Sequence, residues 1–414
     1  MLILYPSIPT GGVETFFLRL SKERARRGLA TKFLLYGKQV RTNKALVNKL
    51  SKYATIYYSG DIFYFSRVGS ALLSMYSLLF LPINENKMGE MLEDVSQIHV
   101  TSGFSLILSS IIQDHSKTRA SITIGIYSSR CFTWGDDLKL PYFEVVNRRF
   151  FTSIPKRNII FFNEKMIKLH DSKLKDDFSN STVFPIGVIN SIHSKLKEYK
   201  AGSKIIRVCS IGRLVNFKTY NLWMLDVLAK LQMKGYQFRY DIYGSGDMQT
   251  IIEKRIELLG LNDIVTLKGH LDYEFFDKTI LDYDLFVGSG TAIIQAASLG
   301  VFSIAAIDSS QTGECAGYFS GVDGTDYVTK RKDKTYKSPE LLIENFINLN
   351  LQEKKLISDK HVEKSKEFSI ERCVSSFIKL DRHYFYFKKK DISVFRYIVS
   401  KITSSLFGRL KGYV

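Results

Sequence analysis

A short part of the chain combines two cations with several glycines. Gly212-Arg213 follows the apolar run VCSI, and Lys218 lies a few residues further on. Another apolar run, FRYDIY, ends at Gly244-Ser245-Gly246. Arginine can hold a phosphate through two parallel hydrogen bonds, lysine supplies a compact charge, and glycine lets backbone N–H groups approach an anion. This combination predicts a site for the phosphates of a bound nucleotide.

Two further glycine turns have the same character. Gly288-Ser289-Gly290-Thr291 separates the run LDYDLFV from the helical pattern AIIQAASLG. A helix N-terminus after such a turn attracts anions, so this turn is the strongest anion cradle in the sequence. It lacks the lysine of a P-loop, which argues against a P-loop nucleotide triphosphatase. Gly11-Gly12 precedes the first expected helix in a similar way, although a plain tight turn explains it equally well.

The elements around these turns alternate between short apolar runs and helical patterns, which predicts an α/β protein with two doubly wound parallel sheets. Ligands of such sheets bind outside the carboxyl ends of the strands, where the four turns lie. Strands are expected at 2–5, 31–36, 55–58, 97–101, 121–126 and 158–162, and then at 206–211, 239–243, 264–268, 285–287 and 302–306. Helices are expected from Gly11-Gly12 to near Gly28, and at 222–233, 247–259, 273–281, 291–299 and 368–380. The expected domains are 1–190 and 204–367, joined by a polar linker at 191–203 and followed by a crossing helix and a basic tail at 368–414.

Composition restricts the class of partner. The chain has 414 residues, with 59 Lys+Arg against 41 Asp+Glu, and its net charge is +18. This excess predicts a phosphorylated ligand, an anionic membrane surface or a nucleic acid as partner. The absence of a nucleic-acid-binding motif argues against the third. The four cysteines contain no CxxC pair, which argues against structural zinc and suits a reducing cytosol.

Histidines suggest no catalytic or metal centre. HExxH and Ser-His-Asp patterns are missing, and His99 and His270, at strand ends, are expected to be structural. No apolar run reaches the ~20 residues of a membrane span, so we expect a cytoplasmic protein that is soluble or peripheral.

The end of the chain is basic. Residues 381–414 carry eight Lys/Arg and two Asp, and their apolar residues recur at helical spacing. The expected apolar face consists of Ile392, Phe395, Val399, Ile402, Leu406 and Leu410. Such a helix could lie in the interface of an anionic membrane, or it could pack its apolar face on the domains. A second basic cluster, beside Phe150 and Phe151, consists of Arg148, Arg149, Lys156 and Arg157.

The four turns, in this order, resemble those of the retaining glycosyltransferases of family 4, over most of the chain. PTGGVETFFLRLSKERARRG is similar to the family's N-terminal glycine loop and first helix, and IGRLVNFK to its Gly-Arg-Leu…Lys segment. IYGSGDMQTIIEKRIELLGLNDIVTLKGH, LDYDLFVGSG and QAASLGVFSI are similar to its C-terminal domain. The resemblance implies the GT-B fold, in which two Rossmann-like domains face a central cleft. It also implies an acceptor-side N-terminal domain, and a C-terminal domain that binds a nucleotide-sugar donor without a required metal or other cofactor.

The resemblance implies roles for particular residues. Arg213 and Lys218 would contact the donor diphosphate and act in catalysis. The remaining donor-binding residues would be Gly11, Gly12, Gly212, Gly244, Gly246, Gly288, Ser289, Gly290, Thr291 and Gln295.

Two polar positions of the family are changed. The family carries Glu-x7-Glu, and here the second position is Gln295 while the first falls on or near Val287. Gln295 could still hydrogen-bond ribose hydroxyls through its amide. A family-type histidine is expected after the strand ending near Ile126, where this chain has Tyr127. Either the sugar is bound through backbone groups, or activity is reduced or lost.

The leading prediction is a retaining transferase of cell-surface polysaccharide synthesis, with a glycan or lipid-linked acceptor. It would lie peripherally on the inner face of the cell membrane. A catalytically degenerate protein acting as a partner subunit is the alternative. A nucleotide-sugar epimerase would need carboxylates and histidines that the sequence does not offer in suitable places.

Overall fold

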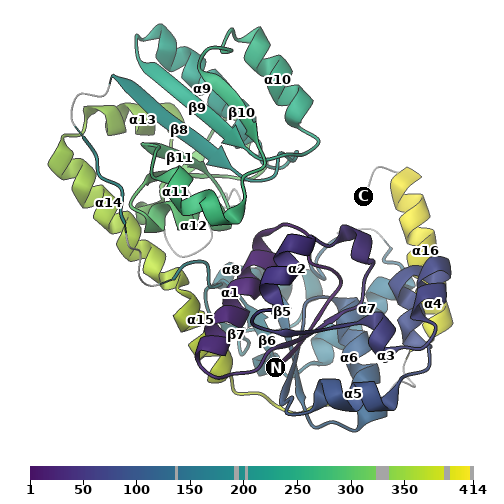
Figure 1. The fold of residues 1–414 in the computed structure, drawn as a ribbon. Coiled ribbons are helices and arrows are strands. Elements are labelled where there is room, and N and C mark those ends of the chain that lie inside the picture. Colours follow the sequence, from purple (N-terminus) through teal and green to yellow (C-terminus); the bar gives the residue numbers. More distant parts are fainter. Residues whose placement is uncertain (136–138, 191–194, 201–203, 323–334, 387–391, 411–414) are drawn as a thin grey trace. The chain divides into compact units, whose positions relative to one another are not determined.

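A computed structural model describes residues 1–135, 139–190, 195–200, 204–322, 335–386 and 392–410. The chain forms two compact units (Figure 1): unit 1 combines Met1–Ile186 with Cys373–Val414, and unit 2 is Gly187–Arg372. The expected linker, 191–203, lies partly outside the described residues. Within its described part, the Tyr199 hydroxyl donates to the Gly300 carbonyl at 3.2 Å, so this part of the segment is anchored to unit 2.

Unit 1 is built on a parallel sheet with strand order β3-β2-β1-β4-β5-β6-β7. The strands are β1 (Leu2–Tyr5), β2 (Lys32–Leu35), β3 (Thr55–Tyr58), β4 (Gln97–Val100), β5 (Ser121–Ile126), β6 (Ile159–Phe161) and β7 (Thr182–Val183). The helices are α1 (Gly12–Arg26), α2 (Lys44–Leu50), α3 (Ser59–Ile62), α4 (Ser66–Leu73), α5 (Glu85–Leu92), α6 (Gly103–Ser116), α7 (Tyr142–Ser153), α8 (Glu164–Leu174) and α16 (Val394–Leu410).

Unit 2 has the strand order β10-β9-β8-β11-β12-β13, in which only β13 is antiparallel. Its strands are β8 (Ile205–Ile211), β9 (Gln237–Tyr243), β10 (Val265–Gly269), β11 (Leu285–Gly288), β12 (Phe302–Ala306) and β13 (Cys315–Tyr318). Its helices are α9 (Tyr220–Met233), α10 (Gln249–Leu258), α11 (Phe276–Ile280), α12 (Thr291–Ser298), α13 (Pro339–Asn348) and α14 (Leu351–Ser365). Both units also contain short 3-10 turns. Those of unit 1 are η1 (Gln39–Arg41), η2 (Ser74–Leu79) and η3 (Lys156–Asn158), and those of unit 2 are η4 (Tyr273–Phe275), η5 (Phe319–Gly321) and η6 (Lys366–Phe368).

These two sheets confirm the predicted fold class. Their central strands read as unbroken apolar runs because helices cover both faces of a parallel sheet. In β1, for example, Leu2, Ile3 and Leu4 are fully buried. The helix expected at 273–281 is instead a 3-10 turn followed by the short helix α11.

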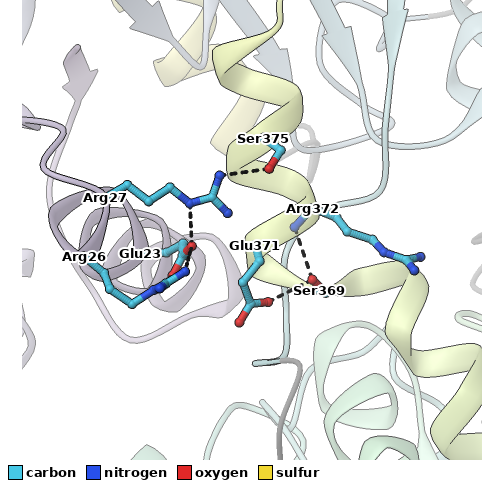
Figure 2. A network of polar contacts seen from close by, with 7 residues as sticks. All are labelled: Glu23, Arg26, Arg27, Ser369, Glu371, Arg372 and Ser375. Carbon is cyan, nitrogen blue, oxygen red and sulfur yellow. Dashed lines mark hydrogen bonds and ion pairs between the residues drawn. The ribbon is translucent and has the colours of Figure 1, made fainter.

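The chain crosses between the units twice. In unit 2 the two connecting segments pair with each other, since Val188 N–H donates to the Phe368 carbonyl at 2.7 Å and Ile370 N–H to the Ile189 carbonyl at 2.8 Å. The second crossing lies inside helix α15 (Ile370–Ile378). Ser369 caps this helix, because its hydroxyl accepts from the Arg372 N–H at 3.2 Å (Figure 2).

A salt-bridge cluster fixes the returning helix to unit 1 (Figure 2). Glu23, near the end of α1, accepts from Arg26 at 2.7 Å and from Arg27 at 2.6 Å. Arg27 donates in turn to the Ser375 hydroxyl at 2.9 Å. The hydrogen bonds from these two arginines lower the pKa of Glu23 below its ordinary value. The Glu23 carboxylate therefore orients Arg27 toward α15.

His99 is structural, as the sequence predicts. It is fully buried in β4, with Nδ1 3.0 Å from the Thr123 hydroxyl and Nε2 2.9 Å from the Tyr127 hydroxyl. Burial lowers its pKa to about 3. His361 in unit 2 is equally buried, and its pKa is also lowered to about 3.

We expect both units to lose stability in mild acid for this reason. The folded pKa of each buried histidine lies below its ordinary 6.5, so the unfolded chain binds more protons as the pH falls below 6.5. At pH 5 each histidine then costs about 2 kcal/mol relative to neutral pH. Urea unfolding at pH 7 and pH 5 measures the effect. The variant His270→Gln, which alters an exposed ring, should show the same fall, and equal midpoints at the two pH values would contradict the expectation.

The second basic cluster is not the exposed aromatic patch that the sequence suggests. Phe150 and Phe151 belong to the core of unit 1, with 3% and 0% of their side chains exposed. Arg148 pairs with Glu144 at 3.0 Å, and Lys156 and Arg157 pair with Asp176 and Asp381. Their aromatic neighbours are buried because the helical spacing of α7 turns them toward the sheet. Across the described residues, no helix has both the length and the hydropathy to cross a bilayer.

Candidate functional site

The loop after β8 carries the two predicted cations. Arg213 is exposed, whereas Lys218 folds back against the end of the strand. A Cβ at position 212 would lie 2.6 Å from the Lys218 ammonium nitrogen, so Gly212 leaves the space that the ammonium group occupies. Burial lowers the pKa of Lys218, with nearby Arg213 adding to the effect. A bound anion would relieve both costs.

The glycines after β9 hold this loop in place. Gly244 and Gly246 have φ of 143° and 153°. A Cβ at position 244 would lie 1.8 Å from the Gly212 carbonyl oxygen, and a Cβ at position 246 would lie 2.2 Å from the Leu214 carbonyl oxygen. The close approach lets Leu214 N–H donate to the Ser245 carbonyl at 3.0 Å. These two glycines therefore support the cation loop through backbone packing.

Two residues after β11 and β12 complete the cluster. The buried hydroxyl of Ser289 donates to Asp308 Oδ1 at 2.8 Å. The segment that follows Asp308 is tied to the cation loop, because Ser309 N–H donates to the Phe217 carbonyl at 2.6 Å and Thr219 Oγ1 to the Ser310 carbonyl at 2.7 Å. The carboxyl ends of β8, β11 and β12, which are neighbours in the sheet, thus meet at one place.

Asp308 is the residue that the sequence analysis missed. Burial raises its pKa, while Ser289 and Lys218 act in the opposite direction. Its carboxylate raises the pKa of Lys218, against the effect of burial. The signal was its position directly after the apolar run of β12, at the ligand edge of a parallel sheet. The cluster therefore contains one partly buried cation, one exposed cation and one carboxylate that keeps the lysine charged.

The glycine turn before α12 has a defined backbone geometry. Gly290 has φ 70° and a Cβ there would meet no atom within 4 Å, so its glycine is required by conformation alone. At Gly288 a Cβ would lie 2.8 Å from the Phe286 ring, which is a packing requirement. Thr291 begins the helix directly after the turn, so the first N–H groups of α12 lie beside Ser289.

Gln295 is buried one turn into α12. Its Nε2 donates to Asp277 Oδ1 on α11 at 2.7 Å. The amide nitrogen is therefore engaged within unit 2, and the Asp277 carboxylate, which the sequence analysis did not single out, stands next to it.

The predicted glycine loop of unit 1 contains a carboxylate. Gly11 precedes α1, and a Cβ there would lie 2.4 Å from Glu14 Oε2. Glu14 is 8% exposed and accepts from the Tyr5 hydroxyl at 2.7 Å. Gly11 thus makes room for a side chain at the start of α1, whereas Gly12 is already the first residue of that helix.

Tyr127 occupies the position where a histidine was expected. Its ring centroid lies 4.7 Å from that of Phe162 and 5.6 Å from that of Phe17. Burial raises its pKa well above the ordinary value. The side chain belongs to an aromatic cluster beside β5.

No metal-binding group is evident in the described ranges, where three His, Cys, Asp or Glu side chains nowhere gather closely enough to hold an ion. At this cluster, the cations that could neutralise an anion are Arg213 and Lys218.

Known structures share this fold at low sequence identity. No protein-family model matches the chain, and a search of curated proteins found no match. A glycosyltransferase from Rickettsia africae ESF-5 is 14% identical with a TM-score of 0.63, covering 91% of this chain and 96% of that one. TarM of S. aureus, solved with fondaparinux, alpha-GlcNAc-glycerol and UDP, is 13% identical with a TM-score of 0.61, covering 92% and 99%. Sucrose-phosphate synthase from Thermosynechococcus elongatus is 12% identical with a TM-score of 0.59, covering 92% and 97%.

The two α/β units are therefore those of the GT-B fold, which this chain shares with glycosyltransferases of known structure. The similarity extends over nearly the whole length of both chains in each comparison.

Proposed function

We propose that this protein is a glycosyltransferase that moves a sugar from a nucleotide-sugar donor to a glycan or lipid-linked acceptor with retention. The observation that carries the proposal is the cluster of Lys218, Ser289 and Asp308, with Arg213 on the same loop. The fold shared with glycosyltransferases supports it. TarM and a pneumococcal O-GlcNAc transferase, which have a similar fold, were solved with UDP bound. Synthesis of a cell-surface polysaccharide is the role we propose.

In the proposed mechanism, the main task of the protein is to stabilise the leaving group. As the bond to the sugar breaks, negative charge develops on the departing diphosphate, and fixed cations and N–H dipoles stabilise it. Arg213, Lys218 and the turn at Gly288–Thr291 would supply them, with Gly212, Gly244 and Gly246 supporting the cation loop. We propose that these two cations replace a metal ion, and that the acceptor hydroxyl attacks on the face that the diphosphate leaves.

The remaining roles are proposals of the same kind. We propose Gly11 and Gly12 as donor-binding residues of unit 1. Gln295 would contact the ribose together with Asp277, whose carboxylate its amide orients. A degenerate partner subunit is less favoured, because Arg213 and Lys218 are both present.

A panel of UDP-, GDP- and dTDP-sugars tests the function. Thermal shift should identify one nucleotide series, and the binding sugar nucleotide should release its nucleoside diphosphate when acceptor extract is added, with or without EDTA. NMR of the product's anomeric proton reads retention directly. Binding without turnover on any acceptor would support the partner-subunit alternative, and no binding to any nucleotide would contradict both.

Asp308→Asn should narrow the pH range of nucleotide binding. The carboxylate raises the pKa of Lys218, so its loss lets Lys218 deprotonate at lower pH. The alkaline limit of affinity for the nucleoside diphosphate should move to lower pH. Titrations between pH 7 and pH 10 measure this, and Asp359→Asn, which changes an exposed carboxylate of α14, serves as the control with an unmoved limit. An unmoved limit in Asp308→Asn would separate the carboxylate from Lys218.

We also propose that the protein lies peripherally on the cytoplasmic face of the membrane, where a lipid-linked acceptor would be found. The basic tail supports this proposal through its charge.

A further inference from the structure

An excursion of the chain in unit 1 projects a helix away from the sheet. Residues 64–82 form this excursion, and its two ends are joined by an isolated antiparallel bridge between Phe63 and Ile83. The bridge is flanked by two backbone hydrogen bonds, from Tyr64 N–H to the Pro82 carbonyl at 2.9 Å and from Asn84 N–H to the Ile62 carbonyl at 2.8 Å. The bridge closes the base of a segment that consists of helix α4 and the turn η2, and Leu78 and Leu79 of η2 are buried in the core of unit 1.

Helix α4 exposes large apolar side chains. Phe65 is 73% exposed, Val68 62% and Leu72 77%, and they recur at helical spacing. On its inner side, α4 packs against η2, where a Cβ on Gly69 would meet Ser77. The exposed face is therefore the outward face of a packed helix.

The backbone at both ends of α4 is strained. Phe65, before the helix, has φ 59°, and Ser74, after it, has φ 55°. Left-handed backbone at a non-glycine residue costs about 1 kcal/mol or more, and strain of this kind is concentrated at functional segments. Phe65 thus combines a strained backbone with an exposed aromatic ring.

Helix α16 exposes a second apolar face beside the excursion. Tyr397 and Ile398 are buried against unit 1, whereas Phe395, Val399 and Ile402 are 78%, 43% and 38% exposed. Three residues of the predicted apolar face are thus exposed, and Ile392, which was expected with them, packs partly against the core. The side chains of Leu406 and Leu410 lie outside the described ones.

The two elements are neighbours. The Tyr397 ring centroid lies 6.5 Å from that of Tyr76 in η2, and Figure 1 draws α4 next to α16. Tyr76 in turn packs on Phe104 at 5.2 Å. Helices α4 and α16 thus each expose several large apolar side chains, and both pack on the turn η2 or its neighbours. Grouped exposed apolar side chains of this kind mark interaction sites.

The charge pattern of this surface favours one kind of partner. Residues 62–84 contain one cation, Arg67, and no carboxylate, and residues 392–414 contain four cations and no carboxylate. Asp61 and Glu85 stand at the two ends of the first range, but both ranges themselves carry only cations. Exposed apolar side chains with such a local excess of cations suit the headgroup region of a bilayer that contains anionic lipids. A protein partner would have to supply a complementary acidic rim.

We infer that α4 and α16 together form a docking surface for an anionic lipid bilayer, with Phe65, Val68, Leu72 and Phe395 entering the interface. This extends the proposed membrane contact of the tail to a second, folded element, and it does not depend on sugar transfer.

Flotation of the full-length protein with vesicles tests the inference. The protein should float with phosphatidylcholine vesicles that contain phosphatidylglycerol, and much less with phosphatidylcholine alone. The double variant V68Q/L72Q should reduce the floating fraction about tenfold or more, because each change removes an apolar group from the interface. The control L258Q/L356Q changes two exposed leucines of unit 2, 73% and 56% exposed, and should float like the wild type.

Each result separates the alternatives. Undiminished flotation of V68Q/L72Q would overturn the role of α4, and no flotation of the wild type would overturn the inference altogether. Light scattering of the same samples measures self-association. If the wild type is a dimer and V68Q/L72Q is a monomer while flotation is unchanged, the surface is a contact between copies of the chain and the inference is overturned. Nucleoside diphosphate release with a soluble acceptor should be the same in V68Q/L72Q and wild type, so failure of the proposed function would be seen independently.

Discussion

Replacing Arg213 and Lys218 together with alanine is expected to abolish sugar transfer while unit 2 stays folded. Both cations would face the charge that develops on the departing diphosphate, and loss of one such group costs on the order of a hundredfold to a thousandfold in rate. The double variant should therefore fall below detection. Arg213 is exposed and Lys218 lies on the cation loop beside Gly212, outside the apolar core of the unit, so we expect unit 2 to stay folded. Release of nucleoside diphosphate from the donor found in the nucleotide panel measures the loss.

The single variants and a matched control sharpen this test. Lys254→Ala removes an exposed cation of α10 from the same unit and should leave turnover unchanged. Arg213→Lys keeps the charge but loses the two parallel hydrogen bonds, so it should fall between the wild type and Arg213→Ala. Wild-type turnover in the double variant would remove these residues from the proposed mechanism.

Gly244→Ala is expected to destabilise unit 2 strongly. The new Cβ would lie 1.8 Å from the Gly212 carbonyl oxygen, at a φ of 143° that alanine rarely adopts. Relief requires the loops after β8 and β9 to separate, which also moves Leu214 away from the Ser245 carbonyl. We expect a loss of about 3 kcal/mol or more, in the range of substitutions that force buried backbone apart. Nucleotide affinity should fall too, because the same displacement moves Arg213.

The control for this prediction is Gly260→Ala. Its φ is 65°, but a Cβ there would meet no atom within 4 Å, so only the conformational cost of about 1 kcal/mol remains. Of the two tryptophans, Trp223 lies in unit 2 and Trp134 in unit 1. Fluorescence-monitored urea unfolding in a Trp134→Phe background therefore reports on unit 2 alone. Equal losses in the two glycine variants would contradict the steric explanation.

The fold was predictable because the strands of a parallel sheet that is covered on both faces consist largely of apolar residues. Strands β1, β3, β5 and β12 match the expected residues, and others differ by one or two residues at an end. The edge strands β7 and β13 were missed. The first is only two residues long, and the second, CAGY, contains none of the branched aliphatic residues that mark the other strands of unit 2. A short edge strand needs a neighbouring strand to define it, which no local pattern records.

The site was predictable where it depends on glycine and less so elsewhere. The glycine turns and the cation loop were found from the sequence, but glycine alone does not distinguish ligand contact from packing. Gly244 and Gly246 support a neighbouring loop, whereas Gly290 faces open space. Asp308 was missed because its importance comes from Lys218 and Ser289, which are distant in sequence. The burial of Phe150 and Phe151 was not predicted, because the apolar face of α7 was not worked out.

The double crossing of the chain sets an order of assembly during synthesis. Unit 2 is one continuous stretch, Gly187–Arg372, so the whole of it leaves the ribosome before unit 1 is complete. Unit 1 still lacks Phe377, which packs on His99 at 5.3 Å, and Tyr397, whose hydroxyl donates to Asn147 at 2.9 Å. Unit 2 can therefore mature first. The helix that carries Phe395 packs on unit 1 only after unit 2 has been made.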